Sequence, residues 1–106
     1  MEGDDEEESS EIHKLWDAQD DEFLIFRNIP VDQRPCSSSD LCAFVYLDRL
    51  FPDEKNRNMI SAAGHDQIWL RITEEQIATL TEVDVLYLTR CGVFHEEEFA
   101  ALSMFA

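Results

Sequence analysis

The most regular pattern of hydrophobic and polar positions lies between residues 67 and 92. At its start, Ile68, Leu70 and Ile72 alternate with other side chains, which is the period-two pattern of a strand with one face on a core. We therefore predict a strand over residues 67–72.

The first of two helix starts follows this strand directly. Thr73 precedes Gln76 by three positions, the spacing at which a hydroxyl and an amide each satisfy a free backbone N–H group at a helix N-terminus. The spacing predicts a short helix over 73–80, with Ile77 and Leu80 facing inward.

The second helix start is at Thr81. Glu82 and Asp84 lie in the first turn of the predicted helix 82–91, where carboxylates favour the positive end of the helix dipole. Gly92 after the last turn is the residue expected where a helix ends in a left-handed conformation.

A hydrophobic stripe on helix 82–91 sets its expected orientation. Val83, Leu86 and Tyr87 stand at positions i, i+3 and i+4, so we predict that this face is buried. Leu86→Ala is accordingly expected to cost about 2–5 kcal/mol.

Two further elements are expected in the first half of the chain. Residues 23–29 are apolar, rich in β-forming side chains and followed by Pro30, which predicts a buried strand. Ser38 or Ser39 can cap a helix over 40–51, stopped by Pro52. Its expected inward residues are Leu41, Phe44, Val45 and Leu47.

The remaining segments are less regular. Met59 to Ala63 suggest a short helix ended by Gly64. Residues 93–106 combine helix formers with Val and Phe, so they fit either a helix or a hairpin that turns at the glutamates. We favour a strand at the end.

These elements predict one globular domain over 23–106. The fold class is α+β, or a small α/β arrangement, with a short sheet of two to four strands packed against three to four helices. A chain of 106 residues supports a single hydrophobic core.

Acidic residues dominate the charge and are concentrated at the N-terminus. The formal net charge is −16, and eleven of the 24 acids lie in residues 1–22 beside a single base, Lys14. We expect this tail to be largely disordered. Repulsion disfavours direct binding to nucleic acids or anionic membranes and favours a partner with a basic surface.

One amphipathic stretch interrupts the tail. Ile12, Leu15 and Trp16 would share one face of a short helix over 11–18. Either Trp16 packs back onto the domain, or the stretch is a recognition segment that folds into the groove of a partner.

Candidate catalytic chemistry is sparse. Cys36, Cys42 and Cys91 form no closely spaced pair, and acidic surroundings disfavour a reactive thiolate. The few glycines exclude a phosphate-binding loop, and the three histidines have no ligand spacing. We expect no catalytic residue, no cofactor, no metal and no membrane span, in a cytoplasmic protein with reduced thiols.

Residues 73–93 are similar in outline to a DNA-binding helix-turn-helix. A recognition helix offers basic or amide side chains to DNA, whereas this second helix offers Glu82, Asp84 and, at its end, Arg90. The resemblance therefore implies the shape without the charge needed to hold a phosphate backbone.

The sequence as a whole predicts a small, acidic, non-enzymatic binding protein. The leading hypothesis is an inhibitor or decoy whose carboxylates engage the basic surface of a nucleic-acid-binding protein, as acidic DNA mimics and antagonists of host defence from phages do. The alternative is a regulatory or scaffold module that recruits a partner through Ile12, Leu15 and Trp16. The expected partner-binding residues are Trp16, Asp17, Asp20, Asp21, Glu22, Glu74, Glu75, Glu82 and Asp84.

Overall fold

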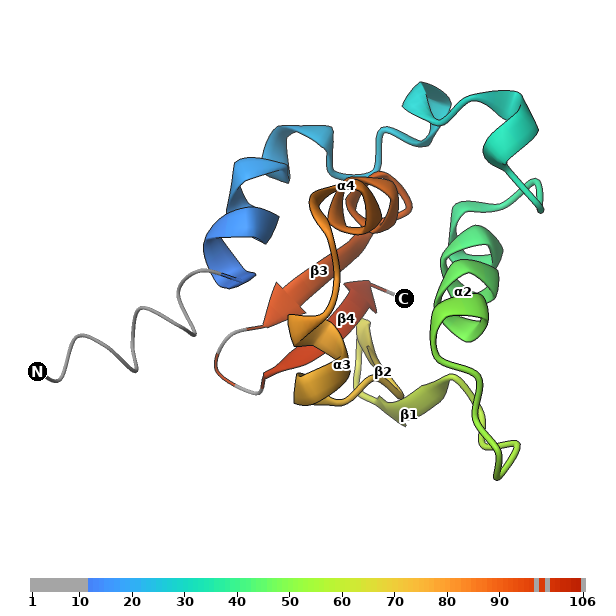
Figure 1. Cartoon of the computed structure of the whole chain (residues 1–106), viewed down its shortest axis with the longest axis vertical. Coiled ribbons are helices and arrows are strands. Elements are labelled where there is room, and N and C mark those ends of the chain that lie inside the picture. Colours follow the sequence, from blue (N-terminus) through green and yellow to red (C-terminus); the bar gives the residue numbers. More distant parts are fainter. Residues whose placement is uncertain (1–11, 97, 99, 106) are drawn as a thin grey trace, which may run out of the picture.

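The second half of the chain forms an antiparallel sheet in a computed structural model that describes residues 12–96, 98 and 100–105. Its four strands stand in the order β1-β2-β4-β3, and Figure 1 shows helices packed around them. The α+β prediction is confirmed. The strands are β1 (Ile60–Ala63), β2 (Gln67–Leu70), β3 (Val93–Glu96) and β4 (Ala101–Phe105).

Strand β4 is central and carries a buried hydroxyl. Ser103 pairs with Trp69 of β2 on one side and with Phe94 of β3 on the other. Its fully buried hydroxyl donates a hydrogen bond to Glu96 Oε1 at 3.1 Å, and the amide of Gln67 donates to the same oxygen. The hydroxyl is thereby satisfied inside the protein, as buried polar groups must be.

Both predicted helix starts are present. Helix α3 (Glu74–Ala78) is capped by Thr73 and helix α4 (Glu82–Arg90) by Thr81, and each start has a complete capping box. Because these bonds use only neighbouring residues, sequence spacing was sufficient to predict them. Ile77 is buried, as predicted.

The buried face of α4 differs from the predicted one. Val83 is 73% exposed and Leu86 only half-buried, whereas Val85 and Leu88 are fully buried and Thr89 nearly so. The stripe at 83, 86 and 87 was therefore wrong at its first position. Positions 83, 86 and 87 and positions 85, 88 and 89 both have the spacing of one helix face. Tertiary packing buries the second set, which is centred on Leu88.

Gly92 ends α4 with a positive φ of 99°, as its position predicted. A Cβ atom here would lie 2.7 Å from Cδ2 of Leu24. The positive φ is the reason that the site favours glycine, since the Leu24 side chain is 53% exposed and its end can move aside.

Helix α2 (Ser39–Leu50) matches the predicted helix 40–51 closely. Its N-cap is Ser38, whose hydroxyl makes no capping bond. Leu47 is fully buried, together with Cys42 and Ala43, but Leu41 is 47% exposed, so its predicted inward position is wrong. Helix α2 packs against α4.

The predicted strand at 23–29 does not form. Leu24 has a φ of 61°, which breaks an extended chain, and the segment contains a short 3-10 helix, η2 (Phe26–Asn28). Its apolar residues cover the domain instead: Ile29 is buried, and the Phe23 ring lies edge-on to that of Phe94, with centroids 6.2 Å apart. Burial of a β-rich run did not require a sheet partner.

The helix expected around 59–63 is also wrong, because these residues include edge strand β1. Ile60 pairs with Leu70 and Ala63 with Ile68 in antiparallel register. All four residues of β1 are exposed. The strand therefore has no alternation of buried and exposed side chains that the sequence could have shown. Pairing with β2 decided its conformation.

The N-terminal segment packs onto the domain from residue 12 onward. A helix over 12–18 and the 3-10 helix η1 (Asp20–Glu22) lie on the opposite side of α4 from α2 (Figure 1). The short amphipathic helix considered at 11–18 is present over residues 12–18. The predicted disorder of residues 1–10 lies outside the described residues.

Candidate functional site

Six of the eight predicted partner-binding acids are exposed. They belong to helix 12–18, to η1 and to the first turns of α3 and α4. Their carboxylates are available for contact with a charged partner. The six are Asp17, Asp20, Asp21, Glu74, Glu75 and Glu82.

Asp84 is committed to internal hydrogen bonds. Its Oδ2 accepts from the backbone N–H of Thr81 at 2.9 Å, and its Oδ1 accepts from the hydroxyl of Tyr46 at 2.5 Å. The carboxylate joins α4 to α2. Asp84 therefore stabilises the contact between the two helices. The sequence could not show this contact because Tyr46 is 38 positions away.

Glu22 is also engaged. Its Oε1 accepts from Asn28 Nδ2 and from Arg90 Nε, each at 2.9 Å. The hydrogen bond from Asn28 and that from Arg90 lower the pKa of Glu22 below its usual value. The carboxylate fastens η1 to the C-terminal turn of α4.

The exposed acids of the N-terminal segment lie apart from Glu82. Glu22 anchors the group at 17–21 near Arg90, at the end of α4, whereas Glu82 lies at its start. Eight residues of helix separate the two ends by about 12 Å at 1.5 Å per residue. The structure therefore does not bring all predicted acids into a single cluster.

Trp16 is buried at 5% exposure in the hydrophobic core. Its ring lies beside His95 of β3, with centroids 6.2 Å apart, and Nδ1 of His13 is 3.2 Å from Nδ1 of His95. Of the two interpretations of this stretch, the one in which Trp16 packs back onto the domain is confirmed. Ile12 and Leu15 are half-buried against the same core.

Two stacked tyrosines connect α2 with α4; the hydrophobic stripe predicted that Tyr87 is buried, but its stacking on Tyr46 depends on tertiary packing. The rings of Tyr46 and Tyr87 are 4.2 Å apart, and the hydroxyl of Tyr87 donates to the carbonyl of Gln33 at 3.0 Å. Burial is the main cause that raises the pKa of both phenols, helped at Tyr46 by its bond to Asp84. These tyrosines remain neutral and structural.

The cysteines are unsuited to nucleophilic chemistry. Cys42 and Cys91 are fully buried, and burial followed by the nearby Cys42 raises the pKa of the Cys91 thiol to about 12. Cys36 is half-buried. A thiol with a raised pKa is a poor nucleophile because the thiolate is the reacting species.

This arrangement predicts that Cys36 is partly accessible in the folded protein, whereas Cys42 and Cys91 are protected from solvent. At pH 8, titration with a thiol-specific disulfide reagent should modify Cys36 at least about tenfold faster than Cys42 and Cys91. All three should react at similar rates in denaturant. Rapid modification of Cys91 in the native protein would contradict the packing of α4.

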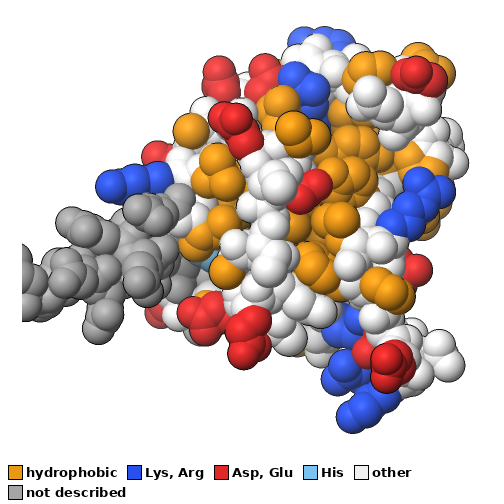
Figure 2. All heavy atoms as spheres, viewed as in Figure 1, with side chains coloured by type: hydrophobic (Ala, Val, Ile, Leu, Met, Phe, Trp, Pro, Cys, Tyr) orange, Lys and Arg blue, Asp and Glu red, His pale blue; other side chains and the backbone are white. Residues whose placement is uncertain are grey.

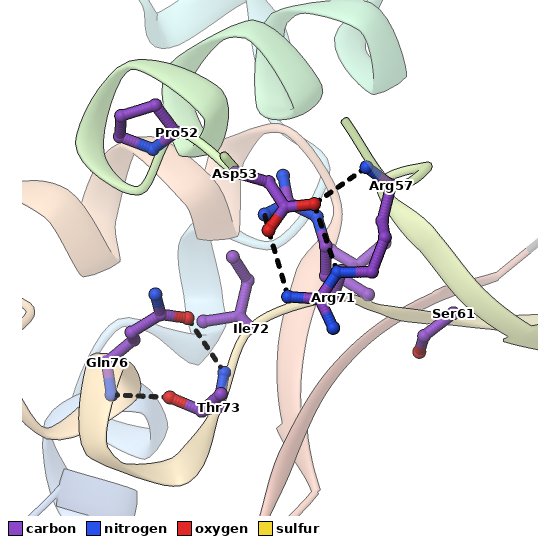
Figure 3. A pocket seen from close by; sticks show the side chains of 9 residues that line it. Pro52, Asp53, Arg57, Ser61, Arg71, Ile72, Thr73 and Gln76 are labelled. Carbon is purple, nitrogen blue, oxygen red and sulfur yellow. Dashed lines mark hydrogen bonds and ion pairs between the residues drawn. The ribbon is translucent and has the colours of Figure 1, made fainter. Parts of the chain in front are cut away.

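An unexpected cluster of charges lies where β2 ends (Figure 3). The guanidinium of Arg57 donates to the Asp53 carboxylate from Nε at 3.0 Å and from Nη2 at 2.9 Å. Asp53 Oδ2 also accepts a hydrogen bond from the backbone N–H of Arg57 at 2.7 Å. These bonds, with the nearby Arg71, hold the pKa of Asp53 well below its usual range. The sequence does not reveal this cluster, because Arg71 is distant along the chain from Asp53 and Arg57.

No group of three or more His, Cys, Asp or Glu side chains within the described residues could hold a metal ion. Among the same residues, no helix has the length and apolar character needed to cross a membrane.

Comparison with known proteins assigns no relative. No protein-family model matches the sequence, and no curated protein or solved structure matches it either.

Proposed function

We propose that the chain is a non-enzymatic binding protein that presents ordered carboxylates to the basic surface of a partner protein. The observation that carries this proposal is the exposure of Glu74, Glu75 and Glu82 on the first turns of two capped helices. Charged groups on rigid elements lose less entropy when they pair, and opposite charge raises the association rate.

The narrower form of the proposal is a decoy for a protein that binds nucleic acids. A net charge of −16 suits such a partner, because its surface is already built to attract a chain of phosphates. Burial of Trp16 favours binding through the carboxylates over recruitment through the N-terminal helix, since little of the tryptophan ring is accessible to a partner.

A triple neutralisation tests the proposal. Full-length chain is immobilised, and proteins captured from a lysate of its source organism are identified by mass spectrometry. In the variant Glu74→Gln, Glu75→Gln, Glu82→Gln, partner affinity should fall about three- to a hundredfold, since each exposed pair contributes roughly 0.2–1 kcal/mol. Wild-type affinity should also fall steeply as salt rises above 0.1 M, where the screening length is about 10 Å.

A matched control carries the same charge change elsewhere. Asp32→Asn, Asp40→Asn and Asp66→Asn alter three exposed acids that lie outside α3 and α4. This variant should retain most of the affinity. Equal losses in both triple variants would show that only total charge matters, and an affinity independent of salt would contradict the proposal. Displacement of the captured protein by double-stranded DNA would support the decoy form.

A further inference from the structure

A small hollow lies where the N-terminal segment meets β3 and the last turn of α4. Acidic side chains are scattered around a hydrophobic centre on the face shown in Figure 2, so exposed carboxylates alone do not mark a site. This hollow places two carboxylates beside aromatic walls. We call it the aromatic hollow. Its volume is about 70 Å³, and its lining includes His13, Asp17, Asp20, Phe23, Phe94 and His95.

The charge of the aromatic hollow favours a cation. Asp17 and Asp20 are exposed, and neither carboxylate has a hydrogen bond or an ion pair with another described residue. No Lys or Arg is among the described residues that line the hollow. The contact between Nδ1 of His13 and Nδ1 of His95 at 3.2 Å needs one of these nitrogens to accept, so at least one ring is neutral. The hollow therefore attracts a cation and repels an anion.

Two buried polar groups in the lining point to a bound polar molecule. Trp16 is 5% exposed and Thr89 is 3% exposed, and both residues line the hollow. The indole Nε1 of Trp16 and the hydroxyl Oγ1 of Thr89 have no hydrogen-bond partner within the described part of the chain. Buried polar groups are normally paired. A water molecule that accepts from the indole N–H can also accept from a cationic group at the hollow.

The walls restrict which cation fits. Phe23 and Phe94 are half-buried, and their rings lie edge-on with centroids 6.2 Å apart. Aromatic rings attract organic cations, and apolar walls accommodate the methylene stem of a lysine side chain. The hollow is far smaller than the roughly 300–1,000 Å³ of sites for whole small molecules. It therefore suits the end of one side chain.

We propose that the aromatic hollow binds a lysine side chain of the partner protein. The ammonium group pairs with Asp17 and Asp20, and the methylene stem lies along Phe23 and Phe94. A compact ammonium group fits this volume better than the planar guanidinium of arginine. The assignment rests on the proposed function, because it requires a partner with a basic surface. It uses carboxylates other than those at the starts of α3 and α4.

Titration of the full-length chain with N-acetyl-lysine N-methylamide tests this site without the partner. The probe should shift the amide signals of Asp17, Phe23 and Phe94 in a saturable manner. Its norleucine analogue has the same stem without the charge and should bind at least about threefold more weakly, since each exposed ion pair contributes roughly 0.2–1 kcal/mol. The arginine analogue should also bind more weakly than lysine. The absence of a saturable shift, equal binding of norleucine, or tighter binding of arginine would overturn the proposal.

A double neutralisation places the probe at the aromatic hollow. Asp17→Asn with Asp20→Asn changes two exposed side chains and should lower the affinity for the lysine probe at least about threefold. Asp32→Asn with Asp66→Asn makes the same charge change at two exposed acids that do not line the hollow and should leave it unchanged. Equal losses in both double variants would overturn the proposal.

The captured partner separates this site from the carboxylates of α3 and α4. Its affinity should fall at least about threefold in the Asp17→Asn, Asp20→Asn variant, in addition to the loss in the triple neutralisation. If only the triple neutralisation weakens the partner, the aromatic hollow is not its binding site and the proposed function stands. If partner affinity is independent of salt, the proposed function fails, and so does the assignment of the lysine to that partner.

Discussion

Replacing Trp16 with Ala is expected to lower the free energy of unfolding by about 3–5 kcal/mol, the usual cost of removing a large buried ring. Trp16 is 5% exposed and is the most buried residue of helix 12–18. Its loss should also release the helix, which chemical denaturation and amide hydrogen exchange of residues 12–18 would both detect.

Two substitutions serve as controls for this prediction. Trp16→Phe keeps an aromatic ring and should cost less than half as much, because the indole N–H has no hydrogen-bond partner among the described residues. Lys14→Ala changes an exposed side chain of the same helix and should stay within about 0.5 kcal/mol. If Trp16→Ala lowered the free energy of unfolding by less than about 1 kcal/mol, the helix would not be packed on the core in solution. The hypothesis that it recruits a partner would then be favoured again.

Leu88→Ala is expected to cost about 2–5 kcal/mol, since it removes a fully buried branched side chain from the centre of α4 and leaves a cavity behind. Thermal and urea denaturation measure the loss. Val83→Ala, at a position 73% exposed on the same helix, should change stability by no more than about 0.5 kcal/mol.

Leu86→Ala tests how the helix is oriented. Because Leu86 is only half-buried, the structure implies a smaller cost than the sequence pattern predicted, between those of the other two substitutions. Equal losses at Val83 and Leu88 would contradict the rotation of α4 found here.

The helix starts at Thr73 and Thr81 and the helix end at Gly92 could be predicted because their causes are local, whereas residues 93–106 fitted either a helix or the hairpin that the structure has there. A capping box needs residues three positions apart, and Gly92 needs only its own backbone conformation. The exposure of Glu74, Glu75 and Glu82 followed from the same reasoning. For these elements, neighbouring residues contain nearly all the information.

Other features depended on contacts between distant residues. Residues 23–29 have the composition of a strand, but Phe23 packs against Phe94 of β3, and Ile29 is buried without any pairing. Strand β1 has no apolar period, yet pairing with β2 makes it extended. In both cases the tertiary environment outweighed a propensity that spans only about 1 kcal/mol.

The sequence by itself determined the fold class, the capped starts of α3 and α4, and the acidic character of the chain. Only the tertiary structure decided which acids stay available, since Asp84 bonds to Tyr46 and Glu22 to Arg90. It alone brought Arg57 and Arg71 together around Asp53. The physical reason is that a short-range pattern specifies backbone conformation, whereas a site depends on side chains that become neighbours after the chain has folded.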